Sequence, residues 1–201
     1  MAKPASPPPR RIATALAGLA AVLILAAIAI VPRLMQMNET SAATIGGPFT
    51  LIDTTGKTVT DADYRGKLML IYFGYTFCPD VCPTSLGTMA QALDQLTPAE
   101  RAQVVPIFIT VDPERDSFDQ LAQYVGNFAP DLIGLTGSRE QINAVETEYH
   151  VYARKAEGSG PNYTMDHSSI FYLMGRDGQF VGHYASGAAP KDLAAGLRKA
   201  L

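Results

Sequence analysis

Cys78 and Cys82 are the only two cysteines in this chain of 201 residues, and three residues separate them. They lie in the segment YTFCPDVCP, directly after the apolar run at residues 68–73. Two sulfurs on one turn at the end of a strand can converge on a soft metal ion or bond to each other. Farther along, His167 in the segment MDHSS adds an imidazole. Two thiolates and one imidazole are a donor set suited to copper.

Copper is the metal that these donors favour. Thiolates select Cu(I), zinc or iron–sulfur clusters, and one imidazole adds affinity for copper as Cu(I) or Cu(II). Zinc is the second choice, because it would close a tetrahedron and only Asp80, Asp166 or water is offered nearby as a fourth ligand. Asp80 and Asp166 are therefore candidate supporting residues. Met165 offers a thioether, but a methionine beside a strand is typical of a core.

The same cysteines allow a redox role or a purely structural disulfide. A structural disulfide is the plainer explanation in an exported domain, but such a bond usually closes a longer loop than the one between Cys78 and Cys82. A redox-active pair would use Cys78 as the attacking thiolate and Cys82 as the resolving thiol. The other two histidines, His150 and His183, are interpreted as ordinary core or surface residues.

Alternating strand and helix patterns surround these residues. The continuous apolar runs at residues 68–73 and 104–111 predict strands that are buried on both faces of a sheet. A turn at residues 175–178 joins two further strand-like runs into a hairpin. Capping-box patterns open three helices, at residues 97–100, 117–120 and 138–141. This alternation predicts an α/β fold, a three-layer sandwich.

Proline shapes the cysteine segment. The residue before a proline is disfavoured in a helix, so Cys78 and Cys82 are expected to be extended or turn residues. Pro83 suits the first position of a helix that runs to about Leu96. This places Cys82 at the N-cap, where the positive end of the helix would lower the pKa of its thiol.

Two other polar segments lie at expected turns. His167 is expected on a turn formed by Asp166, before the next apolar strand. Asp112 begins the segment DPERD at the carboxyl end of the strand at residues 104–111, where ligands and partners of α/β sheets tend to meet. Asp112 is therefore either a supporting residue of the site or part of a capping loop in which Arg115 pairs with an acid.

Residues 12–31 contain no charged side chain and predict a transmembrane anchor. A helix of this length is about 30 Å long and matches a bilayer core, whereas a cleaved leader, the alternative, has an apolar region of about 7–15 residues. Lys3, Arg10 and Arg11 precede the span, and only Arg33 follows closely. The positive-inside rule then places the N-terminus in the cytoplasm. For a bacterial chain, this means a single-pass inner-membrane protein with its C-terminal domain in the periplasm.

The predicted organisation is a cytoplasmic segment (1–11), an anchor (12–31), a linker (32–44) and one domain (45–201). The chain has 16 Lys and Arg against 19 Asp and Glu, and four of the basic residues flank the predicted span. The domain is therefore acidic. This composition argues against a nucleic-acid partner, which would require a basic face.

Three segments together resemble the Sco/SenC family of copper-delivery proteins. They are FGYTFCPDVCP at residues 73–83, VDPERD at 111–116 and DHSS at 166–169. The similarity spans roughly residues 49–201. It implies a membrane-anchored, thioredoxin-like protein that helps to assemble the binuclear copper centre of cytochrome c oxidase.

The resemblance also implies a site and partners. The family's two motif cysteines and its histidine bind copper, and they map onto Cys78, Cys82 and His167. The implied partner is the copper-bearing subunit of the oxidase, with other copper chaperones or thiol reductases as further partners. The alternative is an enzyme, a thiol–disulfide oxidoreductase that reduces the oxidase cysteines. A peroxiredoxin-like peroxidase fits less well, because that family places threonine three residues before its cysteine and Thr76 is two before Cys78.

Overall fold

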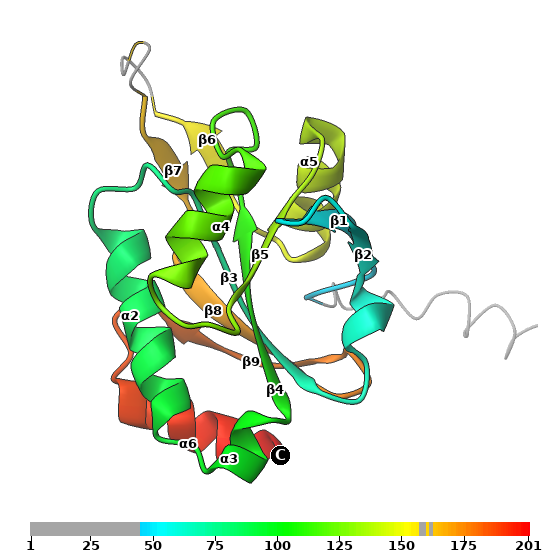
Figure 1. Cartoon of the computed structure of the whole chain (residues 1–201), viewed down its shortest axis with the longest axis vertical. Helices are drawn as coiled ribbons and strands as arrows, with labels where there is room; N and C mark the ends of the chain where they lie inside the picture. Colours follow the sequence, from blue (N-terminus) through cyan, green and yellow to red (C-terminus); the bar gives the residue numbers. More distant parts are fainter. Residues whose placement is uncertain (1–44, 157–159, 161–162) are drawn as a thin grey trace, which may run out of the picture. The chain divides into compact units, whose positions relative to one another are not determined.

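The computed structural model describes residues 45–156, 160 and 163–201, and a seven-stranded mixed sheet runs through the middle of this part (Figure 1). The strand order is β2-β1-β5-β4-β3-β8-β9. β3, β4 and β5 are parallel, whereas β1, β2, β8 and β9 join the sheet in antiparallel pairs. The strands are β1 (Thr50–Asp53), β2 (Thr58–Thr60), β3 (Leu68–Gly74), β4 (Val104–Thr110), β5 (Ile133–Thr136), β8 (Ile170–Met174) and β9 (Phe180–Ala185).

Helices cover both faces of this sheet, which confirms the predicted three-layer arrangement. The helices are α2 (Val81–Asp94), α3 (Pro98–Arg101), α4 (Phe118–Gly126), α5 (Arg139–Glu148), α6 (Pro190–Ala200) and the 3-10 helix η1 (Asp61–Tyr64). The three predicted capping residues accept hydrogen bonds from the backbone of the first helical turn: Thr97 for α3, Ser117 for α4 and Ser138 for α5. The capping patterns therefore located the starts of these helices correctly.

Two neighbouring residues of β3 show what each face of the sheet packs against. Tyr72 faces Phe108 of β4, which in turn contacts Tyr124 of α4. Phe73 points to the opposite face, where it contacts Tyr149 at the end of α5. All seven residues of β3 are buried because helices cover both sides. This explains why the run is continuously apolar instead of alternating.

A second sheet has two strands. It pairs β6 (Ala153–Lys155) with β7 (Met165–His167), and His167 lies opposite Ala153. His167 is therefore on a strand, so the expectation that it sits on a turn is wrong. Figure 1 shows this hairpin above the large sheet, on the same side as the loops that follow β3 and β4.

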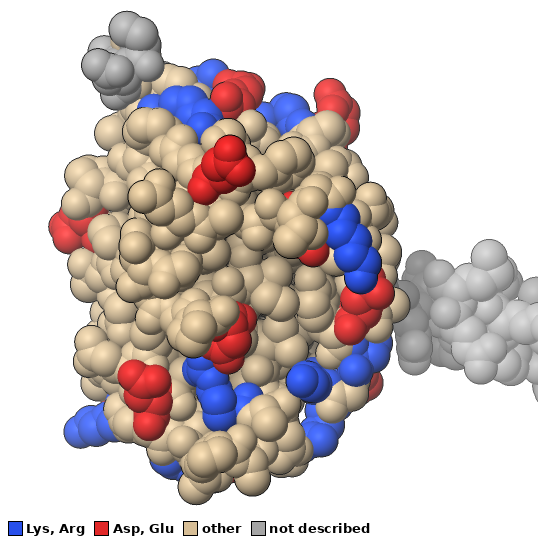
Figure 2. All heavy atoms as spheres, viewed as in Figure 1, with Lys and Arg blue, Asp and Glu red and all other residues tan. Residues whose placement is uncertain are grey.

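The surface of the face with α2 and α4 carries charges of both signs. In Figure 2 the Lys and Arg side chains are interspersed with Asp and Glu, and the middle of this face is mostly uncharged. Within the ranges that the structure describes, no helix is long and apolar enough to span a bilayer. The predicted anchor at residues 12–31 lies outside those ranges.

Candidate metal centre

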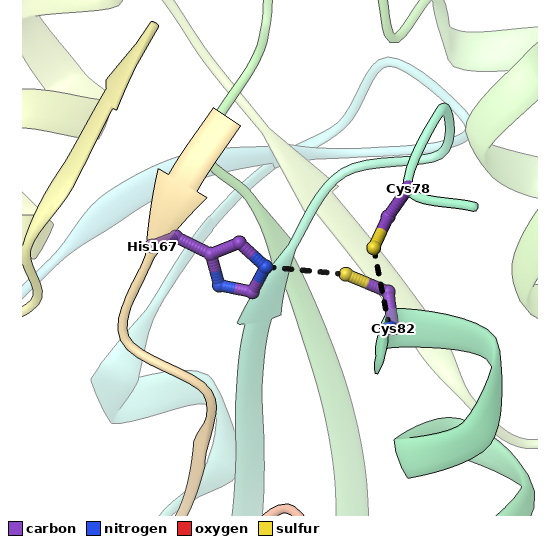
Figure 3. A group of neighbouring side chains, drawn as sticks. All are labelled: Cys78, Cys82 and His167. Carbon is purple, nitrogen blue, oxygen red and sulfur yellow. Dashed lines mark hydrogen bonds between the residues drawn. The ribbon is translucent and has the colours of Figure 1, made fainter. Parts of the chain in front are cut away.

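Cys78, Cys82 and His167 come together above the carboxyl end of β3 (Figure 3). Their ligand atoms all lie within 4.8 Å of one another, and the Cys82 sulfur is 3.3 Å from His167 Nε2. Cys78 is 8% exposed and Cys82 is completely buried. These are the three side chains that the sequence indicated as metal ligands. A loop and the helix that follows it contribute the cysteines, and a strand 85 residues after Cys82 contributes the histidine.

The helix that carries Cys82 starts earlier than predicted. α2 begins at Val81 with Asp80 as its N-cap, so Cys82 lies in the first helical turn and the N-cap assignment to Cys82 is wrong. The helix also ends at Asp94, two residues before the predicted end. Proline is tolerated in a first turn because the N–H groups there have no partner within the helix. This tolerance outweighs the restriction that Pro83 imposes on the residue before it.

One of these free N–H groups points at the other cysteine. The backbone N–H of Cys82 donates to the Cys78 sulfur at 3.3 Å. The N-terminal end of α2 therefore stabilises a thiolate on Cys78, whereas we expected it to act on the Cys82 sulfur. The loop from Tyr75 to Cys78 makes this possible by turning the first sulfur back over the start of the helix.

The two sulfurs have opposite acid–base properties. A hydrogen bond from the Cys82 thiol is the main reason that the pKa of Cys78 is lowered to about 3. The neighbouring His167 side chain and hydrogen bonds from backbone N–H groups add to this effect, and burial opposes it. Donating that hydrogen bond raises the pKa of Cys82, and burial raises it further. The pair therefore holds one proton, on Cys82, and presents one thiolate, on Cys78.

The His167 ring is oriented by its other nitrogen. Nδ1 is 3.1 Å from the carbonyl oxygen of Ser168, which can only accept a hydrogen bond, so Nδ1 carries the proton. The lone pair of Nε2 is then free toward the cysteines. Tyr72 and Tyr75 contact the ring edge-to-face, at centroid distances of 6.3 and 5.8 Å. Both tyrosines therefore wall the site.

Asp116 fixes the segment that leads into the cysteines. Its buried carboxylate accepts hydrogen bonds from the Thr76 N–H at 3.1 Å, the Thr76 hydroxyl at 2.7 Å and the Thr110 hydroxyl at 2.6 Å. Burial raises the pKa of Asp116, against these hydrogen bonds. Gln120 of α4 donates to the same Thr76 hydroxyl at 2.9 Å. The cysteine loop is thus tied to β4 and α4.

Asp112 ties the β6–β7 hairpin to the body of the domain. It is completely buried, and it accepts hydrogen bonds from Arg115 and, at 2.7 Å, from the Tyr163 hydroxyl. Arg115 also donates to the Tyr163 carbonyl at 2.8 Å, and Lys155 pairs with Glu114 at 2.7 Å. Asp112 is therefore the partner of Arg115, the second of the two roles considered for it, and it holds the hairpin instead of facing the sulfurs.

The other supporting candidates also lie outside the cluster of ligands. Asp80 is exposed, and its carboxylate accepts a hydrogen bond from the Thr84 hydroxyl at 3.4 Å. Asp166 is exposed and pairs with Arg154 at 3.5 Å. The contribution of Tyr163 was missed, because no local pattern links it to Asp112, 51 residues earlier.

The arrangement can bind a soft cation with three ligands. Within the described part of the chain, the cluster consists of two sulfurs and one imidazole nitrogen. This donor set fits copper, and three ligands leave a coordination position through which an acceptor could approach. It fits a closed structural zinc site less well, because such a site takes four protein ligands.

Alkylation of the reduced, metal-free chain with iodoacetamide should modify Cys78 first. Its sulfur is slightly exposed and is already a thiolate, whereas Cys82 is buried and protonated. The rate should change little between about pH 7 and pH 5, although an ordinary thiol would slow roughly tenfold per pH unit. Peptide mass spectrometry after timed quenching measures both points. Faster labelling of Cys82, or a tenfold loss of rate per pH unit, would contradict the assigned protonation.

Comparisons with known proteins agree with this geometry. A family model described as SCO1/SenC matches residues 37–201. The protein SCO1 homolog 1, mitochondrial, of Arabidopsis thaliana is 45% identical over 157 residues, which are 78% of this chain and 47% of that relative. The chain thus spans about half the length of that relative.

Solved structures show the same fold. ScoI of Bradyrhizobium japonicum, solved with copper bound, is 46% identical, with a TM-score of 0.72 over 78% of this chain and 99% of that one. BsSco, described as a member of the Sco family of cytochrome c oxidase assembly proteins with a disulfide switch, is 29% identical, with a TM-score of 0.65 over 78% of this chain and 93% of that one. These matches confirm the thioredoxin-like α/β fold. With its two cysteines and its histidine assembled as the motifs predicted, this chain belongs to the SCO1/SenC family.

Proposed function

We propose that this protein binds one copper ion through Cys78, Cys82 and His167 and helps to assemble the copper centre of cytochrome c oxidase. The observation that carries the proposal is the convergence of these three ligand atoms within 4.8 Å. The copper-bound Bradyrhizobium japonicum structure, nearly half identical in sequence, supports copper as the ion. Copper is the cargo, and the protein passes it on instead of using it for turnover.

The oxidase subunit that receives the copper is the proposed partner. The description of BsSco as an oxidase assembly protein supports this choice, as does the family membership of this chain. Three protein ligands leave room for a ligand of the acceptor to bind the same ion, so transfer can proceed by exchange through a shared metal. The small exposure of Cys78 gives the acceptor a side from which to approach.

A second candidate function is thiol–disulfide exchange with the oxidase cysteines. The observation that favours it is the thiolate character of Cys78, which is the attacking sulfur in such a reaction. Its sulfur lies above the start of α2 and next to Cys82, the resolving thiol. The disulfide switch described for BsSco supports this candidate. Copper donation requires His167, whereas exchange requires only the two sulfurs.

Loss of this gene should remove copper from the oxidase when cells grow with limiting copper. Restoring the wild-type chain should restore the oxidase's copper content and activity, and the double variant Cys78→Ala, Cys82→Ala should not. The readout is metal analysis of the purified oxidase together with its activity in membranes. An oxidase with full copper content in the deletion strain under limiting copper would contradict an assembly role.

We also propose that residues 12–31 anchor the chain in the inner membrane, with its domain in the periplasm. The uncharged span and its basic N-terminal flank support this topology. A reporter that is active only in the cytoplasm should be silent when fused after Leu201. A strong signal would show that the domain lies in the cytoplasm, opposite to the proposed orientation. A mature chain that begins after residue 31 would show that residues 12–31 are a cleaved leader and not an anchor.

A further inference from the structure

Two of the buried hydroxyls that have no hydrogen-bond partner within the described part of the chain lie beside the metal centre. The phenol oxygen of Tyr72 is one of them, and Tyr72 has no exposed surface. The other is the hydroxyl of Ser85, which is also completely buried. An unpaired buried polar group costs about 1–3 kcal/mol, so each of these hydroxyls is available to donate to a nearby acceptor.

Both hydroxyls are close to the Cys82 sulfur. Ser85 follows Cys82 by three residues in α2, a spacing that puts both side chains on the same face of the helix. A Cβ atom added to Gly74 would lie 2.9 Å from the Cys82 sulfur and 3.2 Å from the ring atom Cε1 of Tyr72. The sulfur and the edge of the phenol ring therefore border the same small space, which is why glycine is required at this position of β3.

The electrostatics of Tyr72 indicate the same neighbours. Burial is the main cause that raises the pKa of Tyr72, so the phenol keeps its proton and remains a hydrogen-bond donor. Cys82 and the hydroxyls of Ser85 and Ser169 also act on it. None of them meets the geometry of a hydrogen bond to the phenol.

We propose that the Tyr72 and Ser85 hydroxyls donate hydrogen bonds to the copper-bound sulfur of Cys82 and thereby increase the preference of the site for Cu(I) over Cu(II). A metal-bound thiolate keeps lone pairs that accept hydrogen bonds. Such bonds withdraw electron density from the sulfur, and this weakens its bond to Cu(II) more than its bond to Cu(I). Hydrogen bonding around a cysteine sulfur is a known determinant of the potential of copper–thiolate sites.

This inference rests on the proposed function, because it requires copper at the site. Tyr72 and Ser85 act through Cys82 and are positioning residues, so the test must read the state of the copper itself. Tyr72→Phe removes the phenol oxygen and keeps the ring. Ser85→Ala removes the second donor independently. Tyr172→Phe is the matched control, because Tyr172 is also buried in the sheet but packs with Phe73 and Tyr149 on the opposite face.

The full-length chain in detergent is loaded with copper, and three quantities are measured: copper per chain, the midpoint potential of the one-electron couple, and the energy of the thiolate-to-Cu(II) charge-transfer band. All variants should bind one copper. Loss of one hydrogen bond of the usual net strength in Tyr72→Phe or Ser85→Ala should change the Cu(I)-to-Cu(II) affinity ratio about three- to tenfold in favour of Cu(II), where tenfold corresponds to about 59 mV. The band should move to longer wavelength in Tyr72→Phe and Ser85→Ala and stay in place in Tyr172→Phe.

Unchanged potential and band position in both variants, with one copper bound, would overturn this inference alone. An equal shift in Tyr172→Phe would also overturn it, because the effect would then not be specific to these hydroxyls. A wild-type chain that binds no copper would overturn the proposed function as well. If Tyr72→Phe does not fold, Ser85→Ala carries the test by itself.

Discussion

Replacing either Cys78 or Cys82 with alanine should lower the Cu(I) affinity of the reduced chain by more than about 100-fold, and replacing both should abolish binding. Structural zinc in small peptides binds with about 10–16 kcal/mol shared among four ligands, so one sulfur is expected to supply about 3 kcal/mol or more. Copper binding displaces the proton of Cys82, so both sulfurs bind the ion as thiolates, and the imidazole alone cannot hold Cu(I).

Competition with a Cu(I)-specific chelator measures this loss. Met165→Leu is the matched control, because it removes another sulfur, from a buried residue two positions before His167 on β7. The control should keep wild-type affinity. Oxidation of the wild-type chain to the Cys78–Cys82 disulfide should have the same effect as the double variant, because a disulfide offers no thiolate. Stoichiometric copper in the double variant would contradict the assigned centre.

His167→Ala should separate the two candidate functions. Copper affinity should fall by roughly 100-fold, because the variant loses one of three ligands. The Cys78–Cys82 disulfide should still form, because thiol–disulfide exchange does not need the imidazole. Oxidase assembly should nevertheless be lost, and copper added to the medium should restore part of it.

The measurements are copper affinity, reducible disulfide content and oxidase activity in cells that carry this single variant. His183→Ala is the control, since His183 lies on the edge strand β9 and packs against Phe180. Normal oxidase activity in His167→Ala, with copper binding gone, would reject copper donation. The thiol–disulfide function would then take its place.

The sequence predicted those parts of the site whose positions depend on local chemistry. Ser117 and Ser138 cap helices as expected because a capping hydrogen bond spans only three residues. The buried strand before the cysteines followed from its unbroken apolar run. The start of α2 was placed two residues late because two local rules compete at Pro83, and the tolerance of a first helical turn prevailed.

Features that depend on contacts between segments far apart in the chain could not be predicted from local sequence patterns. His167 is on a strand only because residues 153–155 pair with residues 165–167, and the segment at 165–167 is not apolar enough to indicate a strand. Asp112 ties the hairpin to the domain because it accepts a hydrogen bond from the hydroxyl of Tyr163, 51 residues later in the chain. Cys78 is the thiolate, in place of Cys82, because the loop puts the Cys78 sulfur over the start of α2. The carboxylate of Asp116 fixes this loop by accepting a hydrogen bond from Thr76.

The central claim is that Cys78, Cys82 and His167 form one copper site, and copper stoichiometry tests it most directly. The reduced full-length chain is titrated with Cu(I) against a chelator, and bound copper is counted beside the single variants of all three residues. The account predicts one tightly bound copper per wild-type chain and a large loss of affinity in each variant. A wild-type chain that binds no copper, or variants that bind it as tightly as wild type, would contradict it.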